Sequence, residues 1–246
     1  IIDDTPETLT VSCFDPIRRE KAKLTLEALI KDGRIQPGRI EDLYSKISKE
    51  FDENLRRIGE QTVFKLGLPR RNPGLYPYIG RLKYRTSYGQ SVLDHSIQVA
   101  YLSSVRASEL GLDPVRAKRA GLLHDIGKLD IPDEVLNKPG RLSPEEFDII
   151  KSHVKIGYEY LKNQPIDNRI KEACLMHHEK CDGSGYPFGV KNDKIPVFAK
   201  IISIADVYDA MTAARVYRKG LCPFTVIREM ENQCFSSLDP KYAIPF

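Results

Sequence analysis

The segment AGLLHDIGK, Ala120–Lys128, places a histidine beside an aspartate at the end of an apolar helical run. Asp113-Pro114 opens this helix, because aspartate is a favoured N-cap and proline suits the first helical position. Burying a carboxylate among apolar residues is costly unless a charge or a metal ion accompanies it. His124 and Asp125 are therefore the first candidates for a metal site.

The chain contains only five histidines, and their spacing suits successive helices of a bundle. The steps are 29 residues from His95 to His124, 29 to His153 and 24 to His177. A helix of about 15–20 residues with its loop takes such a step, so an up-and-down bundle returns these sites to one layer. A single histidine is more often an ordinary core or surface residue. That explanation does not account for the shared register.

The segment HHEKCDGSGYP, His177–Pro187, begins near the end of a helix predicted over Ile166–Glu179. Adjacent residues point about 100° apart on a helix, but near a helix end the backbone flares, so adjacent side chains can reach a site that holds two neighbouring ions. Asp206, in the apolar segment ISIADVYDAMTAA, continues the series 28 residues later. The sequence therefore predicts a site for two metal ions.

In the first third of the chain, the apolar residues follow two different spacings, one typical of a strand and one typical of a helix. TLTVSCF, Thr8–Phe14, alternates like a strand. A helix then begins at Asp15-Pro16 and ends at Gly33, which suits its C-terminal cap. From Pro37 to about Leu66, apolar residues at steps of three and four predict a long amphipathic helix. GLPRRNPG, Gly67–Gly74, breaks that pattern and marks a domain boundary.

The remainder is predicted to be helical, with no competing strand pattern. Further helices are expected at about Gln90–Leu110, Pro196–Ala214 and Phe224–Phe235, and SPEEF (Ser143–Phe147) is a capping box. The fold class is therefore mainly α. We expect a small α/β unit over residues 1–36, a connecting helix and linker over 37–75, and an all-helical domain over 76–246.

Composition excludes few classes of protein. The apolar fraction of 41% and charged fraction of 29% are typical of soluble globular proteins, and a net charge of +4 neither indicates nor excludes nucleic acid. Five cysteines without a C-x-x-C pair indicate free thiols in a reducing cytoplasm. No run approaches the ~18 apolar residues of a membrane helix. The chain begins without Met, and we interpret it as a fragment for which an upstream membrane anchor remains open.

The ordered set His95, His124-Asp125, His153, His177-His178 and Asp206 resembles the HD superfamily of metal-dependent phosphohydrolases. The resemblance implies an all-helical HD domain with two divalent ions of Mn, Fe or Zn. We assign His95, His124 and Asp206 to one ion and His153, His177 and His178 to the other. Asp125 would bridge the two, and a hydroxide held between them would attack the phosphodiester.

Two branches of this superfamily match different parts of the chain. Residues 1–128 resemble ribonuclease Y, which implies that the first segment is the end of a KH domain, whose GXXG loop binds single-stranded RNA. That loop would lie before Ile1, so no RNA-binding residue is assigned. Residues 129–246 resemble an HD-GYP domain, associated with cyclic di-GMP hydrolysis, because they contain Gly185-Tyr186-Pro187. Ser91 stands where some HD-GYP members carry a third-metal glutamate, so two metals are expected.

Further residues receive roles from their positions. Lys128 is expected to contact a substrate phosphate, and Arg215 and Arg218 to add phosphate contacts. Asp209, one turn after Asp206, either protonates the leaving oxygen or orients a ligand. Tyr186 either lines the substrate pocket or packs beside it.

Three functions compete on these grounds. The first is a ribonuclease-Y-like metal-dependent phosphodiesterase acting on RNA, and the alternative is a cyclic di-GMP phosphodiesterase. The third is a scaffold that binds nucleotide without turning it over, which the complete ligand set argues against. The long helix also offers a contact for a homodimer.

Overall fold

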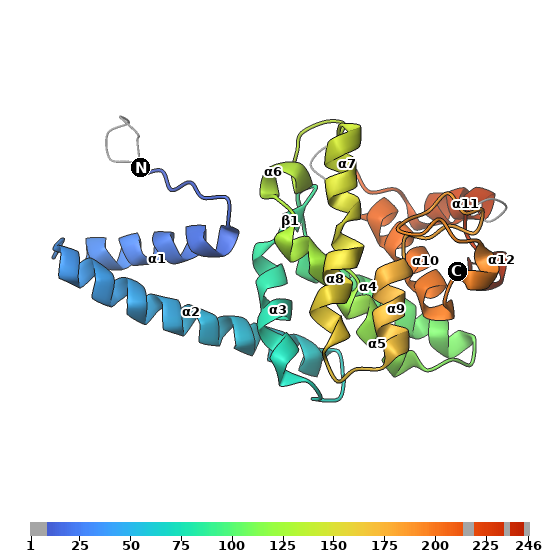
Figure 1. Cartoon of the computed structure of the whole chain (residues 1–246), viewed down its shortest axis with the longest axis horizontal. Coiled ribbons are helices and arrows are strands. Elements are labelled where there is room, and N and C mark those ends of the chain that lie inside the picture. Colours follow the sequence, from blue (N-terminus) through green and yellow to red (C-terminus); the bar gives the residue numbers. More distant parts are fainter. Residues whose placement is uncertain (1–8, 214–218, 234–236, 244–246) are drawn as a thin grey trace.

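In a computed structural model, which describes residues 9–213, 219–233 and 237–243, the chain is mainly helical (Figure 1). The helices are α1 Pro16–Asp32, α2 Pro37–Lys65, α3 Tyr76–Arg81, α4 Val92–Glu109, α5 Pro114–Leu123, α6 Asp133–Leu136, α7 Pro144–Lys151, α8 His153–Lys162, α9 Asn168–Met176, α10 Val197–Thr212, α11 Pro223–Gln233 and α12 Pro240–Ala243. Short 3-10 turns cover Pro73–Leu75, Leu82–Tyr84, Ile126–Asp130 and Asn192–Lys194. Among the described helices, none has both the length and the apolar character that crossing a bilayer requires.

Helices α1 and α2 lie side by side and extend away from the rest of the molecule (Figure 1). The predicted ends of α1 are confirmed, because the Asp15 carboxylate accepts a 2.8 Å hydrogen bond from the Ile17 backbone and Gly33 has φ 70°. The long helix predicted from Pro37 is also confirmed as α2, with 29 residues. Its final turns join the main core through Val63.

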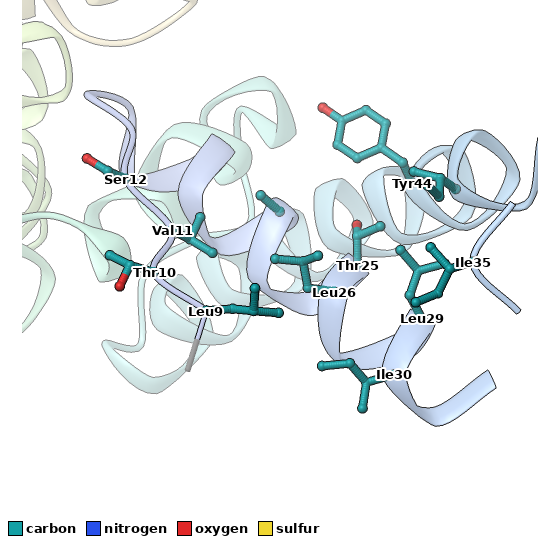
Figure 2. Close-up of a pocket in the computed structure, with 12 residues that line it drawn as sticks. Leu9, Thr10, Val11, Ser12, Thr25, Leu26, Leu29, Ile30, Ile35 and Tyr44 are labelled. Carbon is teal, nitrogen blue, oxygen red and sulfur yellow. The ribbon is translucent and has the colours of Figure 1, made fainter. Parts of the chain in front are cut away.

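The strand predicted over Thr8–Phe14 is wrong for the residues described, 9–14, which form an extended segment without strand pairing. A strand requires a neighbour with which to exchange backbone hydrogen bonds. In the described parts of the chain, the sheet consists of two other strands that pair with each other. The extended segment instead borders an apolar cavity of ≈ 600 Å³ shared with α1 and the start of α2 (Figure 2).

The main core forms where α4, α5, α9 and α10 pack together. Leu122, Leu123 and Ile126, which flank the histidine–aspartate pair, are fully buried. Burying each such side chain contributes about 1.5–3 kcal/mol relative to leaving it in water. The all-helical domain predicted for this part is confirmed in class, and its apolar packing fixes the ends of α5 and α9 next to each other.

A small hairpin departs from the all-helical expectation. β1 (Thr86–Ser87) pairs antiparallel with β2 (Gln90–Ser91), and the turn uses positive φ at Tyr88 (51°) and Gly89 (80°). Strands of two residues are too short to show alternation in a sequence, so the hydrophobic pattern gives no sign of them. The Tyr88 backbone N–H donates to Leu136 O, which holds the hairpin against α6 at the entrance to the histidine cluster.

Candidate metal centre

The five histidines meet because several helices end or begin at one place. Helix α5 ends at Leu123 and α9 at Met176, so His124-Asp125 and His177-His178 directly follow helix ends. The sequence predicts both pairs near helix ends but extends the two helices too far, to about Lys128 and Glu179. The other members of the site are His95 on α4, His153 at the start of α8, and Asp206 on α10. All seven predicted metal-ligand residues are therefore gathered in one cluster.

One local device orients three of the imidazoles. In His124, His153 and His177, Nδ1 donates to the backbone oxygen three positions earlier, at 2.7, 2.7 and 2.8 Å. A carbonyl oxygen only accepts, so Nδ1 carries the proton and Nε2 presents its lone pair. The same bonds satisfy carbonyl groups that a helix end leaves without partners. The backbone thus aims three Nε2 lone pairs into the cluster.

The first group of candidate ligands, the histidine–aspartate set, consists of His95, His124 and Asp206, which offer ligand atoms within 4.8 Å of one another. Nε2 of His95 lies 3.1 Å from Oδ1 of Asp206. The other ring nitrogen of His95 lies 2.6 Å from Oδ2 of Asp209, which also accepts a 3.1 Å bond from Gln90. Asp209 therefore contacts a candidate ligand from behind.

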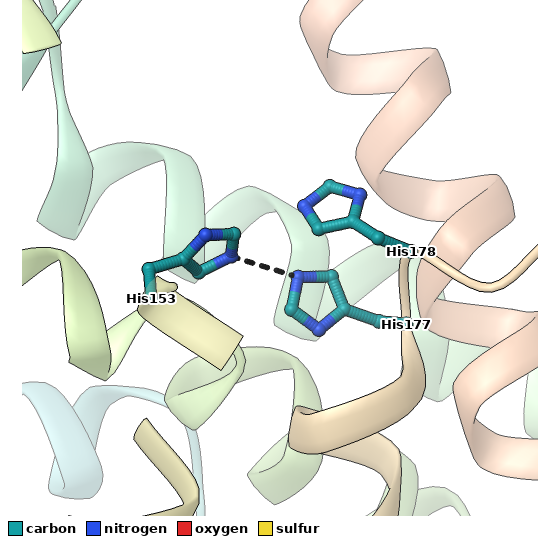
Figure 3. A group of neighbouring side chains, drawn as sticks. All are labelled: His153, His177 and His178. Atoms are coloured by element: carbon teal, nitrogen blue, oxygen red, sulfur yellow. Dashed lines mark hydrogen bonds between the residues drawn. The ribbon is translucent and has the colours of Figure 1, made fainter. Parts of the chain in front are cut away.

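The second group, the three-histidine set, consists of His153, His177 and His178, again within 4.8 Å (Figure 3). Nε2 of His153 and Nε2 of His177 approach to 3.5 Å, the contact dashed in Figure 3. Both rings carry their proton on Nδ1, so neither Nε2 has a hydrogen to donate across this gap. Two lone pairs that face each other are better satisfied by a cation between them.

Asp125 lies between the two sets. Its Oδ2 is 3.3 Å from Nε2 of His124 and 3.6 Å from that of His95, whereas Oδ1 is 3.4 Å from Nε2 of His153. Nζ of Lys128 also contacts Oδ2, at 2.6 Å. A carboxylate with one oxygen toward each set has the arrangement of a bridging ligand, and ligand atoms of His124, Asp125 and His177 form a third compact group.

Two buried polar atoms test whether the residues fit a metal. Nε2 of His124 and Oδ1 of Asp125 are buried without a hydrogen-bond partner. An unsatisfied buried acceptor costs roughly 1–3 kcal/mol, and a divalent cation at the cluster would satisfy both atoms. Imidazole and carboxylate donors suit Mn, Fe and Zn alike. The residues present therefore fit a metal centre.

Burial keeps the three-histidine set neutral. It lowers the pKa of His153 to about 4 and that of His178 to about 3, and it lowers the pKa of His177 well below its usual range. Uncharged imidazoles are the form that ligates a metal. At neutral pH this set is therefore ready to bind a cation without first losing protons.

Charge dominates on the other side of the site. Burial alone lowers the pKa of His95, but Asp206 and Asp209 outweigh it and raise the pKa to about 9. For Asp125, burial alone would raise the pKa, but the nearby His124 and Lys128 outweigh burial and hold this pKa well below its usual range. At neutral pH the carboxylates of Asp125 and Asp206 are therefore ionised, and the His95 imidazole between Asp206 and Asp209 is protonated. Ligation of a metal ion by His95 would release this proton.

A cavity of ≈ 210 Å³ opens onto both sets and is bordered by Lys128 and Tyr186. The Tyr186 ring stacks on the His178 ring, with centroids 4.7 Å apart and planes at 29°. Tyr186 therefore both lines the cavity and packs on a candidate ligand. Gly185 is required here, because a Cβ would lie 2.3 Å from Lys180 N and 2.5 Å from His178 O.

Sequence reasoning missed Gln90, Glu179 and Phe147, and two predicted residues cannot be located. Arg215 and Arg218 lie outside the described residues. The carboxylate of Glu179 is only 3% exposed and accepts hydrogen bonds from the Phe188 and Val190 backbones, at 2.6 and 3.1 Å. The only sequence signal for Glu179 is an acidic residue directly after a double histidine.

The residues of the cluster lie in a part of the chain that matches a known domain family. The HD domain family model matches residues 85–242, so the chain belongs to the HD domain family. Among solved structures, an HDG"Y"P protein from Bdellovibrio bacteriovorus shares the fold with a TM-score of 0.52 and 18% identity. That match covers 98% of this chain and 72% of the other.

Two proteins similar to the chain in sequence are ribonucleases Y. The chain is 41% identical over 249 residues to Ribonuclease Y of Enterococcus faecalis, which covers 99% of this chain and 42% of that protein. It is 49% identical over 179 residues to Ribonuclease Y 1 of Pediococcus pentosaceus, which covers 73% and 32% respectively. The chain spans less than half the length of these relatives. The resemblance to ribonuclease Y, noted for residues 1–128, thus extends through nearly the whole chain.

Proposed function

We propose that this chain is the catalytic part of a metal-dependent phosphodiesterase that cleaves single-stranded RNA internally. The observation that carries the proposal is the position of the Asp125 carboxylate, because its two oxygens face two separate sets of candidate ligands. Two-metal sites of this kind are suited to displacement at a phosphodiester. RNA as the substrate is supported by the 41% identity to a ribonuclease Y over almost the full chain.

The metal ions are proposed to be two, of Mn, Fe or Zn, with the histidine–aspartate set on one and the three-histidine set on the other. When bound, such ions supply Lewis-acid polarisation of the phosphate and lower the pKa of water. The chain contributes fixed geometry, since His124, His153 and His177 are already held in the ligating tautomer. Little reorganisation is then needed on binding.

Lys128 is proposed to contact the substrate phosphate. Its ammonium group lies 2.6 Å from Oδ2 of Asp125 and borders the cavity. A cation bound to that carboxylate would repel the ammonium group, which would then turn toward a phosphate oxygen in the cavity. Phosphate contacts by Arg215 and Arg218 remain proposals from the resemblance alone.

Asp209 is proposed to position His95 instead of protonating the leaving group. Its Oδ2 is already engaged by His95 and Gln90. A carboxylate behind a ligating imidazole fixes the ring and raises its basicity. Of the two roles that its sequence position leaves open, this contact favours the orientation of a ligand.

Hydrolysis of a cyclic dinucleotide is the second candidate function. It is favoured by the loop that contains Gly185-Tyr186-Pro187, because this loop reaches the cavity and stacks Tyr186 on His178. Its substrate offers the same phosphodiester chemistry. The two candidates therefore differ in what surrounds the phosphate.

A parallel assay tests the proposal. Protein with Mn²⁺ or Fe²⁺ is given 5′-monophosphorylated single-stranded RNA and cyclic di-GMP, and internal cleavage leaving 5′-phosphate ends is expected for RNA. Cleavage of the dinucleotide alone would replace the RNA proposal with the second candidate. Turnover of neither by metal-loaded protein would favour the non-catalytic scaffold.

Substitution of Asp125 tests the bridging assignment. D125A is expected to abolish activity and metal occupancy while the helical circular dichroism remains. D130N is the matched control, since Asp130 is an exposed carboxylate on the same turn that accepts a bond from Tyr160. Full activity and full metal content in D125A would refute the assignment.

The remaining assignments are also proposals. We propose the division into residues 1–36, 37–75 and 76–246, with the first part acting as the end of an RNA-binding KH domain.

A homodimer through α2 is supported by apolar Ile40 and Tyr44, which stay partly exposed. Light scattering on the purified chain tests whether it forms this dimer. A cytoplasmic location is supported by the free thiols of Cys13, Cys174, Cys181 and Cys222.

A further inference from the structure

Phe147 on α7 is 44% exposed although it borders the cavity beside the metal centre. It is the last residue of the SPEEF capping box, whose Ser143–Glu146 bonds fix the first turn of α7. A single exposed aromatic residue is unremarkable. Here its ring borders the same cavity as the candidate metal ligands, so a ligand held at the metals comes within its reach.

The surroundings of Phe147 combine aromatic rings with cations. Its ring lies 6.3 Å from that of Tyr186, edge to face at 81°, and Tyr186 in turn stacks on His178. Nζ of Lys151, one turn along α7, lies 4.6 Å from the Phe147 ring centroid. Tyr88 of the hairpin borders the same cavity. Aromatic rings with flanking lysines are the combination that recognises single-stranded nucleic acid, since bases stack and phosphates pair with charge.

We propose that Phe147 is a nucleobase-stacking residue, on which the base of a nucleotide next to the scissile phosphate stacks. The proposal rests on the proposed function, because it takes a phosphodiester as the group bound at the metals. The cavity of ≈ 210 Å³ is smaller than the roughly 300–1,000 Å³ typical of pockets for drug-sized ligands. It suits a phosphate with one neighbouring nucleoside, while further nucleotides lie outside.

A packing role is the competing explanation. Phe147 would then serve only to support Tyr186 through its edge-to-face contact. The two roles make different demands, since packing requires apolar bulk whereas stacking requires a flat aromatic face. Leucine at position 147 supplies bulk without the face, and tyrosine supplies both.

Kinetics with RNA separate these roles. F147L and F147A are expected to raise KM roughly 5- to 100-fold, the range of one lost base–aromatic contact, with kcat changed little. F147Y is expected to restore the wild-type KM. A wild-type KM in F147L, with folding confirmed by circular dichroism, would overturn the proposal.

Fluorescence gives a readout that does not depend on cleavage. The chain contains no tryptophan, so F147W introduces a single indole at the proposed contact. Stopped-flow mixing of metal-loaded F147W with single-stranded RNA is expected to quench the fluorescence of this indole in the binding phase. An RNA with abasic sites is expected to leave the fluorescence unchanged. The control is F64W, because Phe64 is an exposed phenylalanine on α2 with Arg70 over its ring at 5.3 Å and does not border the cavity.

The fluorescence outcomes also separate this inference from the proposed function. Base-dependent quenching in F147W without any RNA cleavage would support stacking and reject the ribonuclease. Cleavage of RNA without quenching would overturn stacking and leave the ribonuclease standing. Equal quenching in F147W and F64W would also overturn it, because the contact would then be unspecific.

Discussion

Oδ2 of Asp209 lies 2.6 Å from Nδ1 of His95, on the opposite side of the imidazole ring from Asp206. Nδ1 of His95 thus contacts a carboxylate, whereas Nδ1 of His124, His153 and His177 contacts a backbone oxygen. A charged partner makes the ring a stronger electron donor than a carbonyl partner does. Asp209 thus orients His95 through a side chain, whereas the backbone orients the other three rings.

D209N is expected to weaken metal binding or activity by about 10–100-fold, as loss of a carboxylate behind a metal-ligating histidine typically does. The loss should be equal for phosphodiesters with good and poor leaving groups, because the residue acts through His95. Steady-state rates on a p-nitrophenyl ester and on RNA measure this. A loss confined to poor leaving groups would instead identify Asp209 as a proton donor.

D94N is the matched control for this variant. Asp94 neighbours His95 on α4 but is exposed, and its backbone N–H donates to the Ser91 side chain. It is expected to keep wild-type metal affinity. A comparable defect in D94N would show that general charge near α4, and not the His95 contact, governs the site.

Gly127 allows α8 to approach the segment that carries His124-Asp125. A Cβ at Gly127 would lie 1.9 Å from His153 O and 2.5 Å from Gly157 N, so G127A forces two backbones apart. Such overpacking typically costs about 1–3 kcal/mol, and displacement of His153 should also reduce metal stoichiometry. Thermal unfolding and calorimetric metal titration measure the two effects. G38A, where a Cβ meets open space on α2, is the control and should lose neither stability nor metal.

The histidines also predict how the stability of metal-free protein depends on pH. His153 and His178 titrate near 6.5 when unfolded but at about 4 and about 3 when folded. Below pH 6.5 the unfolded chain therefore binds more protons, and the free energy of unfolding falls by about 1.4 kcal/mol per pH unit for each proton. The loss runs from pH 6.5 down to about pH 3–4.

His95 gives the opposite sign, because its folded pKa is about 9. Its contribution is complete below pH 6.5 and is lost as pH rises toward 9. Metal-free protein should thus be most stable near pH 6.5, which urea unfolding in EDTA across pH 4.5–9 measures. H178Q should reduce the fall in the free energy of unfolding below pH 6.5 by the contribution of one proton. An unchanged fall would contradict the conclusion that the three-histidine set is neutral.

The sequence predicts the metal-ligand cluster well because spacing alone carries the information. A step near 29 residues equals a helix plus its loop, so His95, His124 and His153 return to one layer whatever the details of the loops. The local signals of helix ends were equally direct, as Asp15 and Gly33 show. These features depend on neighbours in the chain or on the period of a helix.

What the sequence could not predict depends on contacts across the fold. The residues 9–14 alternate like a strand, but a strand exists only when another strand pairs with it. Gln90 and Phe147 reach the site through a two-residue-strand hairpin and a short helix, whose placement no periodic pattern specifies. Their contacts with Asp209 and Tyr186 are set by tertiary packing.

Glu179 holds the loop that carries Tyr186, because its buried carboxylate accepts from the Phe188 and Val190 backbones. E179Q replaces one acceptor oxygen with a donor, so one backbone N–H loses its partner, at a cost of about 1–3 kcal/mol. We expect a lower melting temperature and faster proteolysis within residues 183–190. E172Q, an exposed glutamate on α9, should match the wild type. Equal proteolysis of E179Q and wild type would show that the loop is held by other contacts.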